Sequence, residues 1–231
     1  MSASSATITP ATLRFFRELS RNNRKEWMDA NRERYRSDVV VPFRALLEAL
    51  APAVLKLQPD FDTSGRTGVN FSRINRDIRF ARDKTPYRPQ MYLTFPDPAA
   101  QKGTTQLYVG ISGEAVTAGF RTYAMGSAKK SPLTQVVQPR VASQARWLVR
   151  QKKRLGRRYE SYWYSTENGE WTKHAGWPLE ATEWKKLKGW VVRRKFPPSA
   201  ATRPAFVADI NRLFRDVYPL FTFVSSPSWK S

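Results

Sequence analysis

The stretch TQLYVGISGEAVTAGFRTYAM, residues 105–125, decides the fold class. It holds two runs that are rich in β-branched and aromatic residues, which favour strands, and the runs meet at Gly113 and Glu114. This pattern predicts a β-hairpin whose turn lies at that pair. QMYLTF at 90–95 and the loosely alternating GVNFSRIN at 68–75 predict further strands directly before the hairpin.

Helical patterns precede these strands. Thr9 followed by Pro10 is typical of a helix start, with an N-cap and then a proline at the first helical position. Asn23 with Glu26 three residues later resembles a capping box and predicts the start of a second helix. Apolar residues then recur at helical spacing over 27–57 and predict a long helix with one buried side.

Prolines mark the expected interruptions of the helices. Pro42 is expected to kink or divide the long N-terminal helix, because proline has no N–H and its ring clashes with the preceding turn. A further helical pattern covers 130–160, where Pro139 disturbs the periodicity. A last helix is expected to be capped by Thr202 and to stop at Pro219.

Helices, then adjacent strands, then helices predict an α+β fold rather than alternating β-α units. We expect a single domain over residues 9–224, with a mainly antiparallel sheet flanked by N-terminal and C-terminal helices. Residues 1–8 and 225–231 are expected to be tails. Between 165 and 200 the chain is rich in Gly, Trp and Lys, and irregular structure is expected there.

The charge balance is the strongest global feature of the chain. Forty Lys and Arg residues stand against nineteen Asp and Glu residues, which gives a formal net charge of +21. Such a basic protein attracts polyanions, and nucleic acid is an abundant one. Solubility, or a general preference for Arg, explains the same excess without any partner, and the composition leaves both interpretations open.

Composition also excludes several classes of site. The chain has no cysteine, so disulfides, thiolate zinc sites and cysteine nucleophiles are excluded. No run approaches the roughly 18 apolar residues of a membrane-spanning helix. The start, MSASSATITP, lacks the pattern of a secretion signal. We therefore expect a soluble, cytoplasmic protein with no membrane partner.

The segment NRDIRFARDKTPYR, residues 75–88, concentrates the charge of the chain. Together with Arg73 it holds six basic residues and two acids. Its arginines recur at every third position, which fits neither the alternation of a strand nor one face of an α-helix. The pattern predicts a strand that ends near Asn75, followed by an ordered loop over 77–87.

The acids and the surplus cations of this segment suggest different roles. A guanidinium matches a carboxylate in two bonds, so Asp77 and Asp83 are expected to act as a structural clamp for the loop. The surplus positive charge is expected to bind an anionic ligand, and the candidate ligand-binding residues are Arg73, Arg76, Arg79, Lys84 and Tyr87. The alternative is that the motif is purely structural and that its surplus charge is solvated.

A wider pattern includes this segment. It runs as an arginine, an Arg-Asp pair, an Arg-Phe pair, an acid followed by lysine, and a tyrosine, here Arg73, Arg76, Asp77, Arg79, Phe80, Asp83, Lys84 and Tyr87. The earlier FFRELSRNNRKEWM adds Asn-Asn and Lys-Glu-Trp elements. The combination resembles the signature of a bacterial family, domain of unknown function 2461, over residues 9–223. The likeness is weak at 146–195. It implies a single α+β domain and no particular activity.

A second basic stretch, RWLVRQKKRLGRRYESYWYS at 146–165, combines Lys and Arg with aromatic residues. Arginine-rich helices neutralise phosphates and aromatic rings stack on bases, so contact with nucleic acid is one interpretation. The favoured interpretation is an amphipathic helix with a solvated basic face and a buried side of Trp147, Leu148, Leu155 and Tyr159.

Motifs for enzyme chemistry are sparse. The chain has no Gly-x-Ser-x-Gly elbow, phosphate loop or dinucleotide fingerprint. His174, the only histidine, cannot build a multi-histidine metal site, and as a general base it would need an orienting partner. Mg²⁺ at Asp77 and Asp83 is disfavoured by the six neighbouring cations. No metal and no cofactor are therefore expected.

These observations favour one functional hypothesis and leave two alternatives. The leading hypothesis is an electropositive site around the loop 73–88 that binds a phosphate-bearing ligand, with nucleic acid among the candidates. The first alternative is an enzyme on a phosphorylated or nucleotide substrate, with the same residues as an electrostatic clamp. The second is a non-catalytic interaction domain whose motif is structural.

Overall fold

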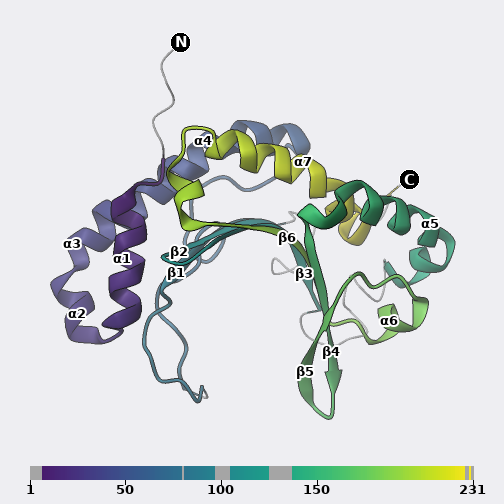
Figure 1. The fold of residues 1–231 in the computed structure, drawn as a ribbon, viewed down its shortest axis with the longest axis horizontal. Coiled ribbons are helices and arrows are strands. Elements are labelled where there is room, and N and C mark those ends of the chain that lie inside the picture. Colours follow the sequence, from purple (N-terminus) through teal and green to yellow (C-terminus); the bar gives the residue numbers. More distant parts are fainter. Residues whose placement is uncertain (1–6, 80, 97–104, 125–136, 227–228, 230–231) are drawn as a thin grey trace. The chain divides into compact units, whose positions relative to one another are not determined.

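The computed structural model describes residues 7–79, 81–96, 105–124, 137–226 and 229 (Figure 1). The chain begins with α1 (Pro10–Arg21), α2 (Lys25–Ala30), α3 (Arg32–Tyr35), the π-helical turn η1 (Arg36–Val40) and α4 (Val41–Leu57). Next come β1 (Gln90–Pro96), β2 (Thr105–Ser112), β3 (Val116–Tyr123), α5 (Gln138–Leu155) and the 3₁₀ turn η5 (Gly156–Arg158). The last elements are β4 (Glu160–Glu167), β5 (Glu170–Ala175), α6 (Ala181–Lys186), β6 (Gly189–Phe196), the 3₁₀ turn η6 (Pro198–Thr202) and α7 (Phe206–Ser225). Phe80 and most of the expected tails 1–8 and 225–231 lie outside the described residues.

The described strands form one sheet in the order β1-β2-β3-β6-β4-β5. β4 lies between β6 and β5 and pairs antiparallel with both. The predicted α+β class is confirmed, with a mainly antiparallel sheet between N-terminal and C-terminal helices of the chain. No helix of the described residues combines the length and the apolarity that crossing a membrane requires.

The chain divides into two compact units. The first unit consists of residues 1–95, 109–117 and 196–212, and the second unit of residues 96–108, 118–195 and 213–231. Each unit buries aromatic side chains of its own. Buried residues of the first unit include Phe15, Phe16, Leu19, Phe43 and Leu50, and those of the second unit include Phe120, Trp184, Trp190, Phe221 and Phe223.

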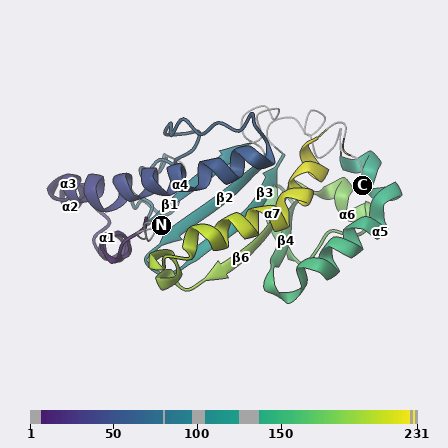
Figure 2. The ribbon, with the colours of Figure 1, turned by 90° about the horizontal axis from the view of Figure 1, so that it is seen from above.

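The long helix predicted for the N-terminal region is divided. α2 ends at Ala30, and α3, η1 and α4 then follow one line (Figure 2). Pro42 lies in the first turn of α4 and has no N–H to donate to the carbonyl of Asp38, four residues earlier. The Thr12 hydroxyl of α1 donates to that carbonyl. Helical dihedral angles continue through Val40 and Val41, so the kink or division predicted at Pro42 is not seen. The chain instead has a π-helical turn before the proline, and the Thr12 bond ties that turn to α1.

The strand predicted over 68–75 is not a regular strand. Its described residues form isolated bridges, one to Thr67, one to β1 and one to Tyr87. Gly68 has a φ of +87°, a conformation that residues other than glycine rarely adopt. The chain therefore turns where the strand was expected to begin, and the following residues run beside β1 with an irregular pattern of hydrogen bonds.

In the second unit, the stretch that was expected to be irregular contains a hairpin and a further strand. β4 and β5 meet at Asn168 and Gly169, whose φ values of 51° and 80° suit a two-residue hairpin turn. Tyr162, Trp163 and Tyr164 of β4 have high strand propensity. The Asn168-Gly169 pair, with aromatic residues on both sides, is the sequence pattern that could have predicted this hairpin.

Two prolines lie in positions other than those expected. Pro139 is in the first turn of α5, where its missing N–H costs no helical bond. The part of the expected helix over 130–136 lies outside the described residues. Pro219 lies within α7, which continues to Ser225, so the prediction that it stops the helix is wrong. Burial of Phe221 beyond the proline stabilises the continued helix.

The basic stretch 146–165 is not a single helix. α5 carries its first part and ends before Gly156, whose φ of +60° is a conformation that residues other than glycine rarely adopt. The aromatic end of the stretch belongs to β4, which begins at Glu160. The predicted buried side is confirmed, since Trp147, Leu148, Leu155 and Tyr159 are all buried.

Replacement of Thr12 by valine is expected to lower the free energy of unfolding by about 1 kcal/mol, because the carbonyl of Asp38 loses the hydrogen bond from the Thr12 hydroxyl. Urea unfolding measures this change. In a Pro42→Ala background residue 42 regains an N–H, so the same Thr12→Val change should cost clearly less. Equal costs in the two backgrounds would show that Thr12 does not compensate for the proline.

Candidate functional site

The predicted loop stands on two short extended segments of the first unit. The N–H of Arg76 donates to the carbonyl of Pro86 at 2.8 Å. Asn75 and Tyr87 form an antiparallel bridge beside this bond. The loop therefore begins after Asn75, as predicted, and backbone hydrogen bonds order its base.

Asn23 anchors that base to the N-terminal helices. Its Nδ2 donates to the carbonyl of Tyr87 at 2.8 Å, and its Oδ1 accepts the N–H of Tyr87 at 3.0 Å. The predicted capping box of Asn23 and Glu26 is wrong, because Arg24 is the N-cap of α2 and the Asn23 amide bonds to Tyr87. The Tyr87 ring is buried, so this candidate ligand-binding residue lies in the packing of the loop base.

Asp83 organises the end of the loop from the surface. Its Oδ1 accepts the N–H of Thr85 at 2.9 Å, and its Oδ2 accepts the Thr85 hydroxyl at 3.0 Å and the Arg76 guanidinium. Hydrogen bonds of this kind favour the ionised form of a carboxyl group. They lower the pKa of Asp83 to about 2, and the bond from the Thr85 backbone has the largest effect.

Asp77 pairs with Arg79, only two residues away. The guanidinium donates twice to the carboxylate, from Nε at 3.0 Å and from Nη2 at 2.7 Å, and this lowers the pKa of Asp77. The side chains of Asp77 and Arg79 are 61% and 76% exposed. Exposed ion pairs contribute little to stability. The pair shapes the loop locally, without the large effect on stability that a buried clamp would have.

The other cations of the loop do not converge on one point. Lys84 donates to the carbonyls of Ile78 at 3.0 Å and Arg79 at 3.4 Å, which ties the tip of the loop together. Arg82 and Arg88 are exposed and form no ion pair with any residue that the structure describes. The candidate binding residues of the loop are thus largely engaged within the loop itself.

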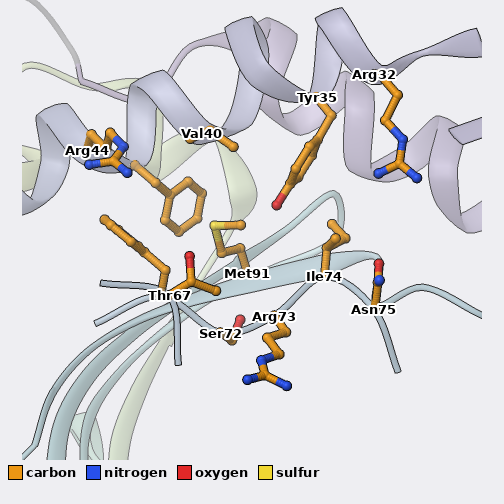
Figure 3. A pocket seen from close by; sticks show the side chains of 12 residues that line it. Arg32, Tyr35, Val40, Arg44, Thr67, Ser72, Arg73, Ile74, Asn75 and Met91 are labelled. Atoms are coloured by element: carbon orange, nitrogen blue, oxygen red, sulfur yellow. The ribbon is translucent and has the colours of Figure 1, made fainter. Parts of the chain in front are cut away.

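A cavity of about 310 Å³ lies near the base of the loop, between α3 to α4 and the segment 67–75 (Figure 3). Its apolar lining consists of Tyr35, Val40, Phe43, Phe71, Ile74 and Met91. Its polar and basic lining consists of Thr67, Ser72, Asn75, Arg32, Arg44 and Arg73. None of these described lining residues is acidic. A cavity of this size and lining suits a small ligand, since such sites hold roughly 300–1,000 Å³.

The floor of the cavity depends on Asn70, whose side chain is fully buried. Its Oδ1 accepts the N–H of Gly65 at 2.9 Å, and its Nδ2 donates to the carbonyls of Asp62 at 2.6 Å and Thr94 at 3.1 Å. Gly65 has a φ of +74°, and a Cβ at this position would lie 3.5 Å from Arg44 Nη1. A glycine and a buried amide therefore hold the turn that lies beneath α4.

The three arginines of the cavity are held differently. Arg32 pairs with Asp29 at 3.1 Å on the surface. The Arg44 guanidinium lies 5.9 Å from the centroid of the Phe71 ring and forms no ion pair with a described residue. Arg73 lines the cavity, but Figure 3 shows its guanidinium directed away from the helices. Arg44 is therefore the arginine that is most available to a ligand.

Tyr35 adds a hydroxyl group to the cavity. Its ring packs on Phe15 with 5.9 Å between the centroids, and Figure 3 shows the hydroxyl directed from the helix toward the segment below. Burial raises the pKa of Tyr35, so the hydroxyl is a protonated donor at neutral pH. Sequence reasoning missed Tyr35 and Arg44 as site residues, because their helical spacing is the same as that of core and surface positions.

Metal sites and a serine triad have little support in the described residues. No three His, Asp or Glu side chains of the described residues come together as a metal site. His174 stacks on Trp163 at 4.0 Å, and its Nε2 lies 2.8 Å from Ser165 Oγ and 3.2 Å from Glu167 Oε1. Ser165 is fully buried and its hydroxyl donates to Glu167 at 2.8 Å, so this cluster does not present a serine nucleophile at the surface.

Replacement of Asn23 by alanine removes both bonds to Tyr87 and is expected to lower the free energy of unfolding by about 1–3 kcal/mol. The loop base should also open more often, so trypsin should cut at the basic residues of the loop faster than in the unmodified protein. Asn22→Ala is the matched control, because Asn22 donates to the carbonyl of Glu18 in its own helix. Equal rates of cleavage in the two variants would contradict the anchoring role of Asn23.

The carboxyl group of Asp83 is expected to titrate at about pH 2, measured by NMR of its carboxyl carbon. Because this folded-state pKa lies below the ordinary value, the stabilising bonds are complete above about pH 4 and are lost as the pH falls toward 2. Arg76→Gln and Thr85→Val each remove one side-chain donor and should raise the pKa of Asp83. An unchanged pKa in both variants would argue against the observed cluster.

Comparison with known proteins supplies a family and leaves the activity open. A search of the curated proteins finds no match. The family model described as "Conserved hypothetical protein (DUF2461)" matches residues 11–223. This range includes Asn23, the Arg-Asp loop and every lining residue of the cavity. The resemblance noted in the sequence is thereby confirmed, and the chain belongs to the DUF2461 family.

Proposed function

We propose that this protein binds a small phosphate-bearing ligand with an apolar or aromatic part, such as a nucleotide, in the cavity beside α3 and α4. The composition of the lining supports this proposal, since apolar side chains stand next to arginines and none of the described lining residues is acidic. Apolar walls remove the body of a ligand from water, and guanidinium groups donate two parallel bonds to a phosphate. Phosphate alone would leave most of the lining unused.

Arg44 is the residue that we assign to the anionic group. It lies at the edge of the apolar lining, over the ring of Phe71, and no described carboxylate neutralises it. The Tyr35 hydroxyl is directed into the cavity at some distance from Arg44 (Figure 3), so it can donate a hydrogen bond to another part of the ligand. Arg32 lies at the opposite end of the lining from Arg44 (Figure 3), so it can contact another part of the ligand if its surface pair with Asp29 opens, which costs little.

In this proposal the loop 73–88 acts mainly through its electrostatic field. Its six cations and two acids leave an excess of positive charge beside the cavity. Such a field raises the local concentration of anions, and the effect falls as salt screens it. Arg76, Arg79 and Lys84 would then assist binding without contact, whereas Arg73 connects the loop to the lining.

An enzyme on a phosphorylated substrate would use the same cavity. Such an enzyme would convert the bound ligand into a chemically different product, whereas a binding protein would release the ligand unchanged. Incubation of the bound probe and analysis of its products therefore separates this alternative from plain binding.

Isothermal titration calorimetry with AMP, phenyl phosphate, adenosine and inorganic phosphate tests the proposal. AMP and phenyl phosphate carry both an apolar and an anionic part, so they should bind more tightly than adenosine or phosphate. Arg44→Gln should raise the Kd of AMP by about tenfold or more, because a hydrogen bond to a charged group contributes about 1.5–3 kcal/mol. Tyr35→Phe should cause a smaller loss.

The control for net charge is Arg14→Gln, because Arg14 is exposed on α1 and does not line the cavity. This variant should bind AMP like the unmodified protein. Equal losses from Arg44→Gln and Arg14→Gln would show that binding is diffuse attraction to a basic surface. Absence of binding for both two-part probes at low salt would refute the proposed function.

A further inference from the structure

The second unit presents a sheet face that takes no part in the proposed cavity. In the β4–β5 ladder, Tyr164 lies opposite Lys173, and Thr166 lies opposite Trp171. Residues that face each other across a ladder, and every second residue along a strand, lie on the same side of a sheet. One face of β4, β5 and β6 therefore carries Tyr162, Tyr164, Trp171, Lys173 and Arg193.

The opposite face of these strands is the core side of the second unit. Trp163 and Trp190 are directly paired there and are both buried. Trp190 packs on Trp184 at 5.4 Å and on Phe120 at 5.2 Å between ring centroids. Because that side supplies the core, the aromatic residues of the first face need another explanation.

The rings of the first face form a connected row. Trp171 lies 5.7 Å from Tyr164 and 6.2 Å from Tyr123, and Tyr164 lies 5.7 Å from Tyr162. Tyr123 of β3 packs where a Cβ on Gly189 of β6 would stand, which leaves space for its ring. The three tyrosines are half-buried, and Trp171 is 56% exposed. The exposed ring of Trp171 therefore continues into three partly accessible rings, and a contiguous patch of this kind suits an interaction surface.

Basic side chains accompany these rings. Lys173 Nζ lies 4.0 Å from the centroid of the Tyr162 ring, and the Arg193 guanidinium lies 5.0 Å from the same ring. Arg121 lies two residues before Tyr123 on β3 and therefore shares its side of the sheet. Glu160 pairs with Arg193 at 3.0 Å. Among the described residues of β3 to β6, the cations of this face outnumber its acids.

We propose that this face binds single-stranded nucleic acid, with bases stacked on Trp171 and Tyr164 and phosphates held by Lys173 and Arg121. Every base has a flat π-face, so a row of rings provides stacking that tolerates any sequence, while cations follow the backbone. An acidic peptide would use the cations and leave the rings without stacking partners. A duplex keeps its base faces inside the helix, where these rings do not reach them.

Fluorescence anisotropy with labelled oligo-uridine and oligo-thymidine at low salt measures the affinity. Trp171→Ala removes one stacking partner and should raise the Kd by about tenfold. Trp171 is exposed, so this variant should fold, and Trp171→Phe should restore most of the affinity. Lys173→Glu should weaken binding more than Lys186→Glu, which changes the net charge equally at an exposed position of α6.

A duplex of the same length is the comparison ligand, and tighter binding of the single strands supports the proposal. Three outcomes would overturn it: no binding of either single strand, an unchanged Kd in Trp171→Ala, or equal losses from Lys173→Glu and Lys186→Glu. Arg44→Gln, which should lose AMP, is expected to keep its affinity for the oligonucleotides. The nucleic-acid site and the cavity can therefore fail or succeed separately.

Discussion

The buried side chain of Asn70 is the interaction on which the first unit depends. Backbone groups of Gly65, Asp62 and Thr94 all bond to this one amide. A buried polar group that loses its hydrogen-bond partner lowers stability by about 1–3 kcal/mol. An apolar residue in place of Asn70 would remove the side-chain partner of all three backbone groups. Because Asn70 joins the turn to β1, the irregular segment stays beneath α4, and the space between them remains a cavity.

Local patterns predicted the elements well, and contacts between distant residues explain the exceptions. Helical spacing and strand alternation are properties of neighbouring residues, so the α+β class followed from them. Asn23 shows the limit. Its local partner Glu26 favours a capping box, yet its amide bonds to Tyr87, 64 residues away. Pro219 shows a second limit, because packing around α7 outweighs the local effect of the proline.

The candidate site was predictable only in part, for the same reason. The ion pairs of the loop join residues that are only a few positions apart in the sequence, so pairing between its arginines and its two aspartates could be predicted. Arg44 and Tyr35 line the cavity because the helices on either side of the π-helical turn lie opposite the segment 67–75. The spacing of residues along the chain does not predict which distant segments lie opposite each other. Trp171 and Lys173 were not predicted as strand residues, because the Gly, Trp and Lys content of the surrounding stretch suggests irregular structure. The turn at Asn168 was the overlooked local pattern.

Each compact unit is assembled from three separate stretches of the chain. β2 passes from the second unit into the first, and α7 passes from the first into the second. No single cut in the polypeptide therefore releases either unit whole. In evolutionary terms, neither unit can be transferred to another protein as one uninterrupted piece of gene, so gene duplication and fusion would copy the two units together.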